Sequence, residues 1–453
     1  MIAAVRKELR PMMRLAGPLV MAELGWMAMG FVDVVMAGRI GPAAIGAGGV
    51  GSMLFFPIVI AGTGLISGMD TLVSQAFGAK DEVECRRSLI AGLWLSLAVT
   101  PVVIALLLAT IPLLRALGTN PEVMNLLDPY VRTLAWGVPP LILYSAFRRY
   151  LQARNVVRPI TFAVVSANLV NFAGNWLLMY GNWGAPRLGL TGSGISTALA
   201  RAYIGLVLAI ALVAHERGSG SRLFVMDWRP DLARIRRLAA LGAPAAAQIG
   251  VEGAVFGIVS VMAAKLDPIS LAAHTVGINV ISLSYMVPLG ISAAAAVRVG
   301  QAVGRRDAHG AAVAGWTALG LGGLFMGLAG VLLFTAPRAV ARLYSPDDAV
   351  IGLSATLLWI AAFFELFDGL QVVATGALRG LGDTRTPAVA HFTGYWIFGL
   401  PIAWALCFHY GWGVRGLWVG LTVALILIGT VLIVFWERKV GRTNSPGAAA
   451  ATG

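Results

Sequence analysis

The chain alternates between long apolar windows and short stretches that carry charges, glycine or proline. A transmembrane helix needs about 20 consecutive apolar residues to cross a hydrocarbon core of about 30 Å. Twelve windows reach this length, at residues 12–36, 46–74, 88–113, 126–152, 159–181, 188–214, 236–262, 270–300, 310–336, 350–376, 387–410 and 413–437. The pattern therefore predicts an all-α integral membrane protein with twelve transmembrane helices.

The two halves of the sequence match when the chain is shifted by 226 residues. The register runs without a gap from residue 18 aligned with 244 to residue 81 aligned with 307. Within it, Gln75-Ala-Phe-Gly-Ala-Lys-Asp81 returns as Gln301-Ala-Val-Gly-Arg-Arg-Asp307. Each half holds six predicted spans, and an even number gives both halves the same orientation in the membrane. The sequence thus predicts two parallel six-helix repeats related by an axis along the membrane normal.

The repeat and the polar breaks suggest where the parts of the chain begin and end. We expect an N-lobe at residues 1–214, a cytoplasmic linker at 215–235, a C-lobe at 236–440 and a disordered tail at 441–453.

Composition and charge support the membrane class. Only 12% of the 453 residues are charged and 58% are apolar, which leaves too little polar surface to cover a soluble protein of this size. The net charge of +13 comes from Lys and Arg that are dispersed between the apolar windows, so we expect no nucleic-acid partner.

The distribution of positive charge predicts the orientation. Twenty-five of the 34 Lys and Arg residues lie on the side of the N-terminus and eight on the other side, with Arg201 inside the sixth span. Cytoplasmic loops carry the excess of positive charge. We therefore expect a multi-pass protein of the cell inner membrane with both termini in the cytoplasm.

Acidic side chains lie inside several predicted spans. Asp33 is in the first span, Glu252 in the seventh, and Glu365 and Asp368 in the tenth. A charge at the centre of a membrane helix costs about 3 kcal/mol on insertion scales, so each acid is a candidate functional residue. Because acids attract cations and repel anions, we expect Asp33, Glu252 and Asp368 to bind or couple cations.

Polar and aromatic residues accompany two of these acids in the C-terminal half. Gln248 precedes Glu252 by one helical turn, and Phe364 and Gln371 flank Asp368 at one turn on either side. We expect these side chains to line a polar cavity together with the acids. The simpler alternative for any one of the acids is a buried structural hydrogen bond.

The N-terminal half carries a similar set. Asn171 and Asn175 share one face of the fifth span, and Trp26 and Met29 lie on the face of Asp33 in the first span. Aromatic and thioether groups beside an acid suit large, flat organic cations. Such stripes also pack simply against neighbouring helices, and buried amides can join helices. The histidines are scattered near span ends, so we do not expect them to form a relay: His215, His274, His309, His391 and His409.

Several of these motifs together resemble a known family. The Gln-x-x-Gly-x-x-Asp loops after the second and eighth spans, the segment Leu378-Arg-Gly-Leu-Gly-Asp-Thr-Arg-Thr-Pro387 and the intramembrane acids are similar to those of the multidrug and toxic compound extrusion family. The resemblance covers residues 10–440 and points to the NorM-type branch. It implies cation binding at Glu252 and Asp368, and a polar site of the N-lobe at Asp33, Asn171 and Asn175.

One departure from the family bears on the coupling ion. Some members have a tyrosine one turn before the acid of the tenth span, where this chain has Phe364. Sodium needs several oxygen ligands, whereas a proton needs one tunable carboxylate. Sodium at Glu252 and Asp368 remains possible, and the missing hydroxyl favours protons slightly.

These observations predict an antiporter that exports cationic drugs or dyes in exchange for H⁺ or Na⁺, acting as a monomer in the lipid bilayer without a cofactor. A flippase for lipid-linked oligosaccharides would require basic residues to hold its pyrophosphate, and the spans are acidic instead. An intramembrane enzyme would require a nucleophile with a base or a metal motif such as His-Glu-x-x-His, which does not occur in the sequence. We therefore do not expect an enzyme.

Overall fold

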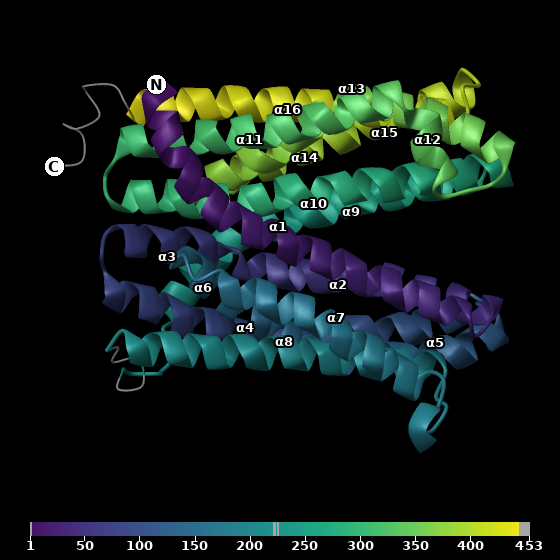
Figure 1. Ribbon diagram of the computed structural model, residues 1–453, viewed down its shortest axis with the longest axis horizontal. Helices are drawn as coiled ribbons and strands as arrows, with labels where there is room; N and C mark the ends of the chain where they lie inside the picture. The colour runs from purple at the N-terminus through teal and green to yellow at the C-terminus, as the bar shows by residue number, and fades with distance from the viewer. Residues whose placement is uncertain (1, 221–222, 224–225, 444–453) are drawn as a thin grey trace. The chain divides into compact units, whose positions relative to one another are not determined.

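The regular elements of the structure are helices (Figure 1). The computed structural model describes residues 2–220, 223 and 226–443. The elements are α1 (Ile2–Gly38), α2 (Pro42–Ile66), α3 (Gly68–Gly78), α4 (Glu82–Ala116), α5 (Pro121–Trp136), α6 (Val138–Ala153), α7 (Arg158–Leu178), η1 (Asn182–Gly184), α8 (Leu190–Gly218), α9 (Leu232–Ala264), α10 (Pro268–Gly304), α11 (Ala308–Thr335), α12 (Pro337–Arg342), α13 (Asp348–Gly380), α14 (Arg385–Phe392), η3 (Thr393–Gly399), α15 (Leu400–Trp404), η4 (Ala405–His409) and α16 (Val414–Thr443).

Eleven of the predicted spans correspond to helical stretches that are long and apolar enough to cross a membrane, counted over the described residues. The all-α membrane fold is therefore confirmed. The fourth span is an exception, because residues 126–152 do not form one helix. They belong to α5 and α6, which have 16 residues each and meet at Gly137.

Two prolines explain this break. Pro139 and Pro140 stand in the first turn of α6, where they lack the N–H groups that would bond to carbonyls of the preceding turn. A 16-residue helix is about 24 Å long, which is shorter than the hydrocarbon core. The two short helices together occupy the region predicted as the fourth span.

The eleventh span is also irregular. It begins as α14, passes through the π-helical segments η3 and η4, and contains only one short α-helical piece, α15, between them. Wide π turns are rare and occur frequently at functional sites. The first of them begins two residues after His391.

The two copies of the repeated heptapeptide adopt the same local structure. Lys80 and Arg306 have left-handed backbones, with φ of 61° and 58°. The next residue in each copy caps the following helix: Asp81 accepts a hydrogen bond from the Glu84 amide at 2.9 Å, and Asp307 accepts one from the Gly310 amide at 2.7 Å. The repeat is thus visible in backbone geometry as well as in sequence.

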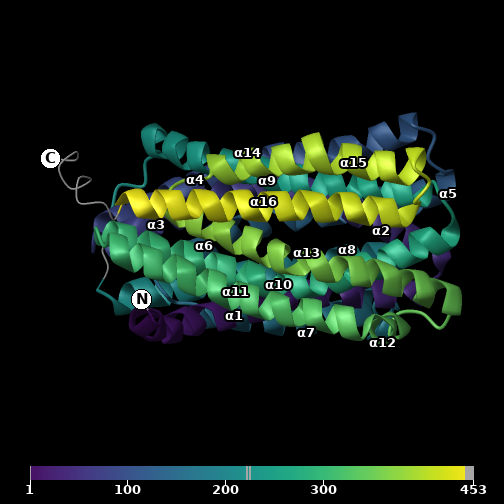
Figure 2. The same ribbon diagram turned by 90° about the horizontal axis from the view of Figure 1, so that it is seen from above.

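The chain divides into two compact units. Of the described residues, those in 2–20, 78–80 and 247–443 form unit 1, and those in 21–77 and 81–246 form unit 2. Within unit 1, α13 packs against α10, α11 and α16 (Figures 1 and 2). Within unit 2, α8 packs against α5, α6 and α7.

Each unit includes the first half of a helix from the other repeat. In unit 2, a Cβ on Gly64 would lie 2.7 Å from Ala246 Cα, at the start of the second repeat. In unit 1, a Cβ on Gly290 would lie 2.6 Å from the Val20 amide nitrogen, at the start of the first repeat. Both contacts are equivalent under the shift of 226 residues. Glycine is needed at both positions because a side chain would collide with the neighbouring backbone.

The lobe boundaries expected from sequence stay a prediction. The predicted linker is helical at both ends, because α8 continues to Gly218 and α9 begins at Leu232. Residues 221–222 and 224–225 of that linker lie outside the described part of the chain. Of the predicted tail, residues 441–443 end α16, and residues 444–453 lie outside the described residues.

Candidate functional site

Four of the polar residues predicted in the C-terminal half lie together in unit 1. Glu252 and Gln248 come from α9, and Asp368 and Gln371 come from α13. The charge of Asp368 acts on Glu252, and the Gln371 side chain interacts with both acids. Together with His391 of α14, these residues form what we call the Glu252 cluster.

His391 is the central residue of the Glu252 cluster, and its side chain is fully buried. Its Nδ1 lies 2.7 Å from the carbonyl oxygen of Pro387, and its Nε2 lies 2.6 Å from Gln371 Oε1. Gln371 in turn donates from Nε2 to Asp368 Oδ1 at 3.1 Å. Gln248 Nε2 also lies 3.3 Å from His391 Nε2. A continuous chain of hydrogen-bonding groups therefore joins His391 to Asp368.

Glu252 lies at the edge of this chain. Its Oε2 is 4.0 Å from His391 Nε2. The hydroxyls of Tyr285 and Tyr395 face its carboxylate from α10 and η3. The Tyr395 hydroxyl is buried and falls short of hydrogen-bond geometry with any described residue. The carboxylate thus has polar neighbours on several helices.

Two predicted residues of the tenth span lie outside this chain of contacts. Phe364 is buried, with its ring 6.2 Å from that of Trp418. Glu365 is fully buried, and Ser284 of α10 donates to its Oε1 at 3.1 Å, while Oε2 has no partner among the described residues. Since a buried carboxylate oxygen without a partner is costly when charged, Glu365 is best accommodated as a neutral acid.

The predicted acid of the first span has the expected neighbours in unit 2. Asp33 Oδ1 accepts a hydrogen bond from Asn175 at 2.6 Å, and Oδ2 accepts one from Thr197 at 3.1 Å. Asn171 donates to Thr197 and accepts from Asn175, each at 3.3 Å. These residues form the Asp33 cluster. Thr197, on α8, was not identified from the sequence.

Trp26 and Met29 of α1 are placed mainly by helix packing. Trp26 donates to the hydroxyl of Tyr144 at 3.2 Å, and the two rings lie 5.6 Å apart. Met29 is buried. One turn before Trp26, Glu23 forms an ion pair with Arg148 of α6. These contacts attach the second half of α1 to α6.

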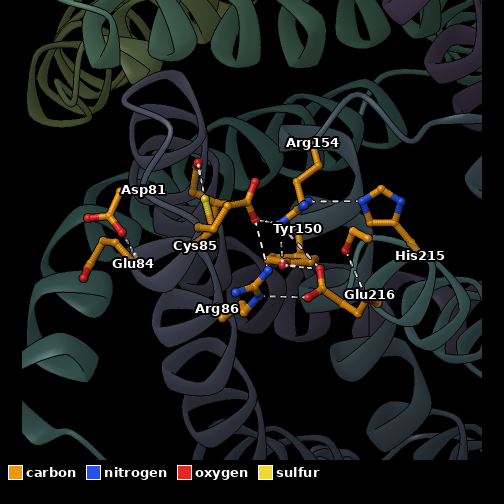
Figure 3. Close-up of polar contacts among 11 residues, drawn as sticks. Asp81, Glu84, Cys85, Arg86, Tyr150, Arg154, His215 and Glu216 are labelled. Carbon is orange, nitrogen blue, oxygen red and sulfur yellow. Dashed lines mark hydrogen bonds and ion pairs between the residues drawn. The ribbon is translucent and has the colours of Figure 1, made fainter. Parts of the chain in front are cut away.

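A third polar cluster surrounds Glu216 near the end of α8 (Figure 3). Tyr150 donates to its Oε1 at 2.7 Å, Arg86 donates to its Oε2 at 3.0 Å, and Arg154 lies 3.4 Å from Oε1. Arg154 also donates to His215 at 3.2 Å. Because Glu216 is fully buried and both of its oxygens are engaged, this Glu216 cluster fastens α4, α6 and α8 to one another.

Ligand types for either proposed coupling ion are present in the Glu252 cluster. Carboxylate, amide and hydroxyl oxygens, which sodium prefers, come from Glu252, Asp368, Gln371, Tyr285 and Tyr395. Among the described residues, no group of three or more His, Cys, Asp or Glu side chains could hold a metal ion. Sodium binding at Glu252 and Asp368 stays a prediction.

Known proteins resemble this chain over almost its full length. It is 35% identical to the probable multidrug resistance protein NorM of Mesorhizobium japonicum, covering 96% of this chain and 94% of the relative. It is 38% identical to the multidrug resistance protein NorM of Burkholderia vietnamiensis, covering 92% and 91%. The crystal structure of the eukaryotic MATE transporter AtDTX14 has the same fold, with a TM-score of 0.88 at 21% identity over 97% of this chain and 99% of that one.

The match to the family follows the internal repeat. A sequence model of the family described as MatE matches residues 18–177 and again residues 244–405. These stretches begin at residues 18 and 244, the pair at which the two halves of the sequence first align. With both repeats matched and relatives of this identity over nearly the whole length, the chain belongs to the MatE family.

Proposed function

We propose that this chain is an antiporter that exports cationic drugs by alternating access, and that protons are its coupling ion. The relatives named multidrug resistance protein NorM support drug export. The two acidic clusters support cationic cargo, because carboxylates inside a membrane protein attract cations. The acidic character of both clusters also argues against a flippase with anionic cargo.

Hydrogen-bond accounting at His391 supports the proton. The Pro387 carbonyl can only accept, so Nδ1 of His391 must carry a hydrogen. If the imidazole is neutral, the Nε2 lone pair can accept a hydrogen bond from Gln248 Nε2 at 3.3 Å, but it also faces Gln371 Oε1 at only 2.6 Å, which is an unfavourable approach of two acceptors. One additional proton removes this conflict.

The additional proton has two possible positions. On His391, it lets Nε2 donate to Gln371 Oε1 while the Gln371 amide donates to an ionised Asp368. Alternatively, the Gln371 amide reverses and donates to His391, and a protonated Asp368 then donates to the amide oxygen. The two amide orientations are equivalent in shape. His391, Gln371 and Asp368 therefore form a chain suited to hold one exchangeable proton.

Transport follows from competition for the acids. Cargo binds when Glu252 and Asp368 are ionised, and protonation of either acid weakens the attraction and favours release outside. The two repeats then reorient and return the proton to the cytoplasm. A membrane potential adds about 2.3 kcal/mol per net charge per 100 mV. We place the protein in the inner membrane with both termini in the cytoplasm, and we take it to work as a monomer.

The test uses purified protein in proteoliposomes loaded with a fluorescent organic cation. We expect efflux on a pH gradient in sodium-free buffer, loss of efflux when an uncoupler collapses the gradient, and little response to added sodium. Asp368→Asn should abolish coupled efflux, whereas Asp348→Asn, at the exposed start of the same helix, should not. Efflux that requires sodium and persists without a pH gradient would show that protons are not the coupling ion. If the dye moves under neither gradient, the proposed antiport function is wrong.

A further inference from the structure

Arg201 is a buried cation within unit 2 that the proposed transport cycle does not use. It lies on α8, one turn after Thr197 of the Asp33 cluster, and only 6% of its surface is exposed. Its guanidinium carbon lies 4.1 Å from the centre of the Phe55 ring. Its Nε and Nη1 atoms have no hydrogen-bond partner among the described residues.

The surroundings hold the guanidinium in place without neutralising it. At Gly137, a Cβ would lie 3.0 Å from Arg201 Cδ and 3.1 Å from Nη1, so the side chain occupies space that the glycine leaves free. The face of Phe55 supplies a cation–π contact. Neither neighbour offers an anion or an acceptor for the free N–H groups.

The charge of Asp33 acts on Arg201, but Nε and Nη1 of the guanidinium make no hydrogen bond to it among the described residues. Both oxygens of Asp33 accept hydrogen bonds from Asn175 and Thr197 instead. The other titratable neighbour is the phenol of Tyr130, which is uncharged at neutral pH. Asp33 and Arg201 thus carry opposite charges that act on each other, while Nε and Nη1 of Arg201 have no partner among the described residues.

Buried guanidinium groups are costly unless an anion is near, and Arg is the side chain best suited to bind carboxylates. We propose that Arg201 determines the cargo preference of the N-lobe: its guanidinium binds the carboxylate of an ampholytic cargo whose cationic group lies at Asp33. This proposal rests on the proposed export function and narrows it to molecules that carry both charges. The same guanidinium repels a cargo that is only cationic.

A matched pair of dyes tests the preference. Rhodamine 110 carries a cationic ring system and a free carboxylate, and rhodamine 123 is its methyl ester, so the pair differs only in the negative charge. Equilibrium binding of each dye is measured by fluorescence polarisation on purified wild-type protein and on Arg201→Gln and Arg201→Lys. Efflux of both dyes from proteoliposomes is measured in parallel.

For Arg201→Gln, we expect binding of rhodamine 110 to weaken by about tenfold, the scale of a charge-assisted hydrogen bond. Binding of rhodamine 123 should stay equal or become several-fold tighter, because a repelling charge is gone. Arg201→Lys keeps the positive charge but not the planar set of donors, so its preference for rhodamine 110 should lie between those of wild type and Arg201→Gln. If Arg201→Gln does not fold, Phe55→Leu removes the ring that holds the guanidinium and should reduce the preference for rhodamine 110.

The outcomes separate this proposal from the export function. Equal weakening of both dyes would assign Arg201 a structural role and overturn the proposal, as would wild-type protein that binds only the ester. If wild-type protein binds both dyes with the expected ratio but transports neither, the binding preference stands and the proposed export fails.

Discussion

His391 and Gln371 lie 20 positions apart in the sequence, and their side chains meet at 2.6 Å between α14 and α13. The imidazole is fixed on its other side by the Pro387 carbonyl, so it cannot turn away from the amide. The side-chain amide of Gln371 can instead rotate by about 180°, which swaps the positions of its oxygen and its nitrogen. A change in the protonation of His391 therefore changes the hydrogen bond that Asp368 receives from Gln371.

Replacement of His391 tests this connection. His391→Gln keeps a donor and an acceptor but cannot carry a charge, so we expect coupled efflux to fall about tenfold and its pH dependence to flatten. His309→Gln, at an exposed position of α11, is the matched control and should leave both unchanged. Efflux rates measured from pH 5.5 to 8.5 give the comparison. A wild-type pH profile for His391→Gln would exclude the imidazole from coupling.

The predicted cation-binding acids can be tested in cells. Asp33→Asn, Glu252→Gln and Asp368→Asn remove a charge with little change in shape, so we expect near-normal expression and loss of most drug resistance. Resistance is measured as growth against a cationic drug, with membrane-fraction immunoblots for expression. Full resistance at normal expression for both Glu252→Gln and Asp368→Asn would remove the C-lobe acids from the mechanism.

Loop labelling tests the orientation. In a background without Cys85 and Cys407, single cysteines at 80 and 306 should react with a membrane-impermeant maleimide only from the cytoplasmic side. Both positions are exposed, and their loops lie on the side of the membrane that carries most of the Lys and Arg residues. A cysteine at position 187, between η1 and α8, should react only from outside. Reaction of position 187 from the cytoplasm alone would reverse the topology.

The Glu216 cluster predicts a large effect on stability. Glu216→Gln leaves Arg86 and Arg154 buried with a weaker counter-charge, and breaking a buried ion pair costs about 3–5 kcal/mol. Glu82 pairs with both arginines, so we expect about 2–3 kcal/mol. Glu82→Gln is the control and should cost under about 1 kcal/mol, because Glu82 is 42% exposed. Heat unfolding in detergent measures both, and equal shifts would contradict the assignment of Glu216 as the central residue.

Asp383 predicts a pH-dependent contribution to stability. It lies between α13 and α14, where burial would raise its pKa, but hydrogen bonds from Lys439 and Thr386 hold the pKa below the usual value. A lowered pKa stabilises the folded state above about pH 4, and the contribution disappears as the pH falls through the folded-state value. Asp383→Asn should therefore lower stability by about 1 kcal/mol at pH 7, with a smaller difference from wild type at pH 3.5. A difference independent of pH would show that the charge plays no part.

The positions of the spans could be predicted because crossing a membrane imposes a length on each apolar window. The repeat could be predicted because its loops need a left-handed residue followed by a helix-capping Asp, which keeps the motif recognisable in both copies. The break at Gly137 could not, because membrane helices also tolerate proline as a kink. Whether Pro139 bends a helix or ends it depends on the neighbours of that helix.

For the candidate site, the sequence predicts which residues share a face of one helix, but not which residues of different helices meet. Spacing along a single helix groups Gln248 with Glu252, and Gln371 with Asp368. It does not show that an imidazole from the eleventh span lies between these pairs. In the sequence His391 is only a histidine close to the start of an apolar window, and the packing of α9, α13 and α14 is needed to bring it to the acids. The sequence shows that Arg201 is a charge deep in a span, but only the fold shows that its Nε and Nη1 have no partner among the described residues.

The exchange of helix halves between the units has a consequence for how the protein is made. Val20 and Gly290, which pack together in unit 1, are 270 positions apart, so the first turns of the chain leave the ribosome long before their partner exists. In the same way, Gly64 is synthesised well before Ala246, the residue against which it packs. The N-terminal repeat therefore enters the bilayer before the partners of Gly64 and of the start of its own first helix have been synthesised. Neither unit can be completed until the second repeat has been inserted, and a chain cut in the linker would yield two fragments that each need the other to fold.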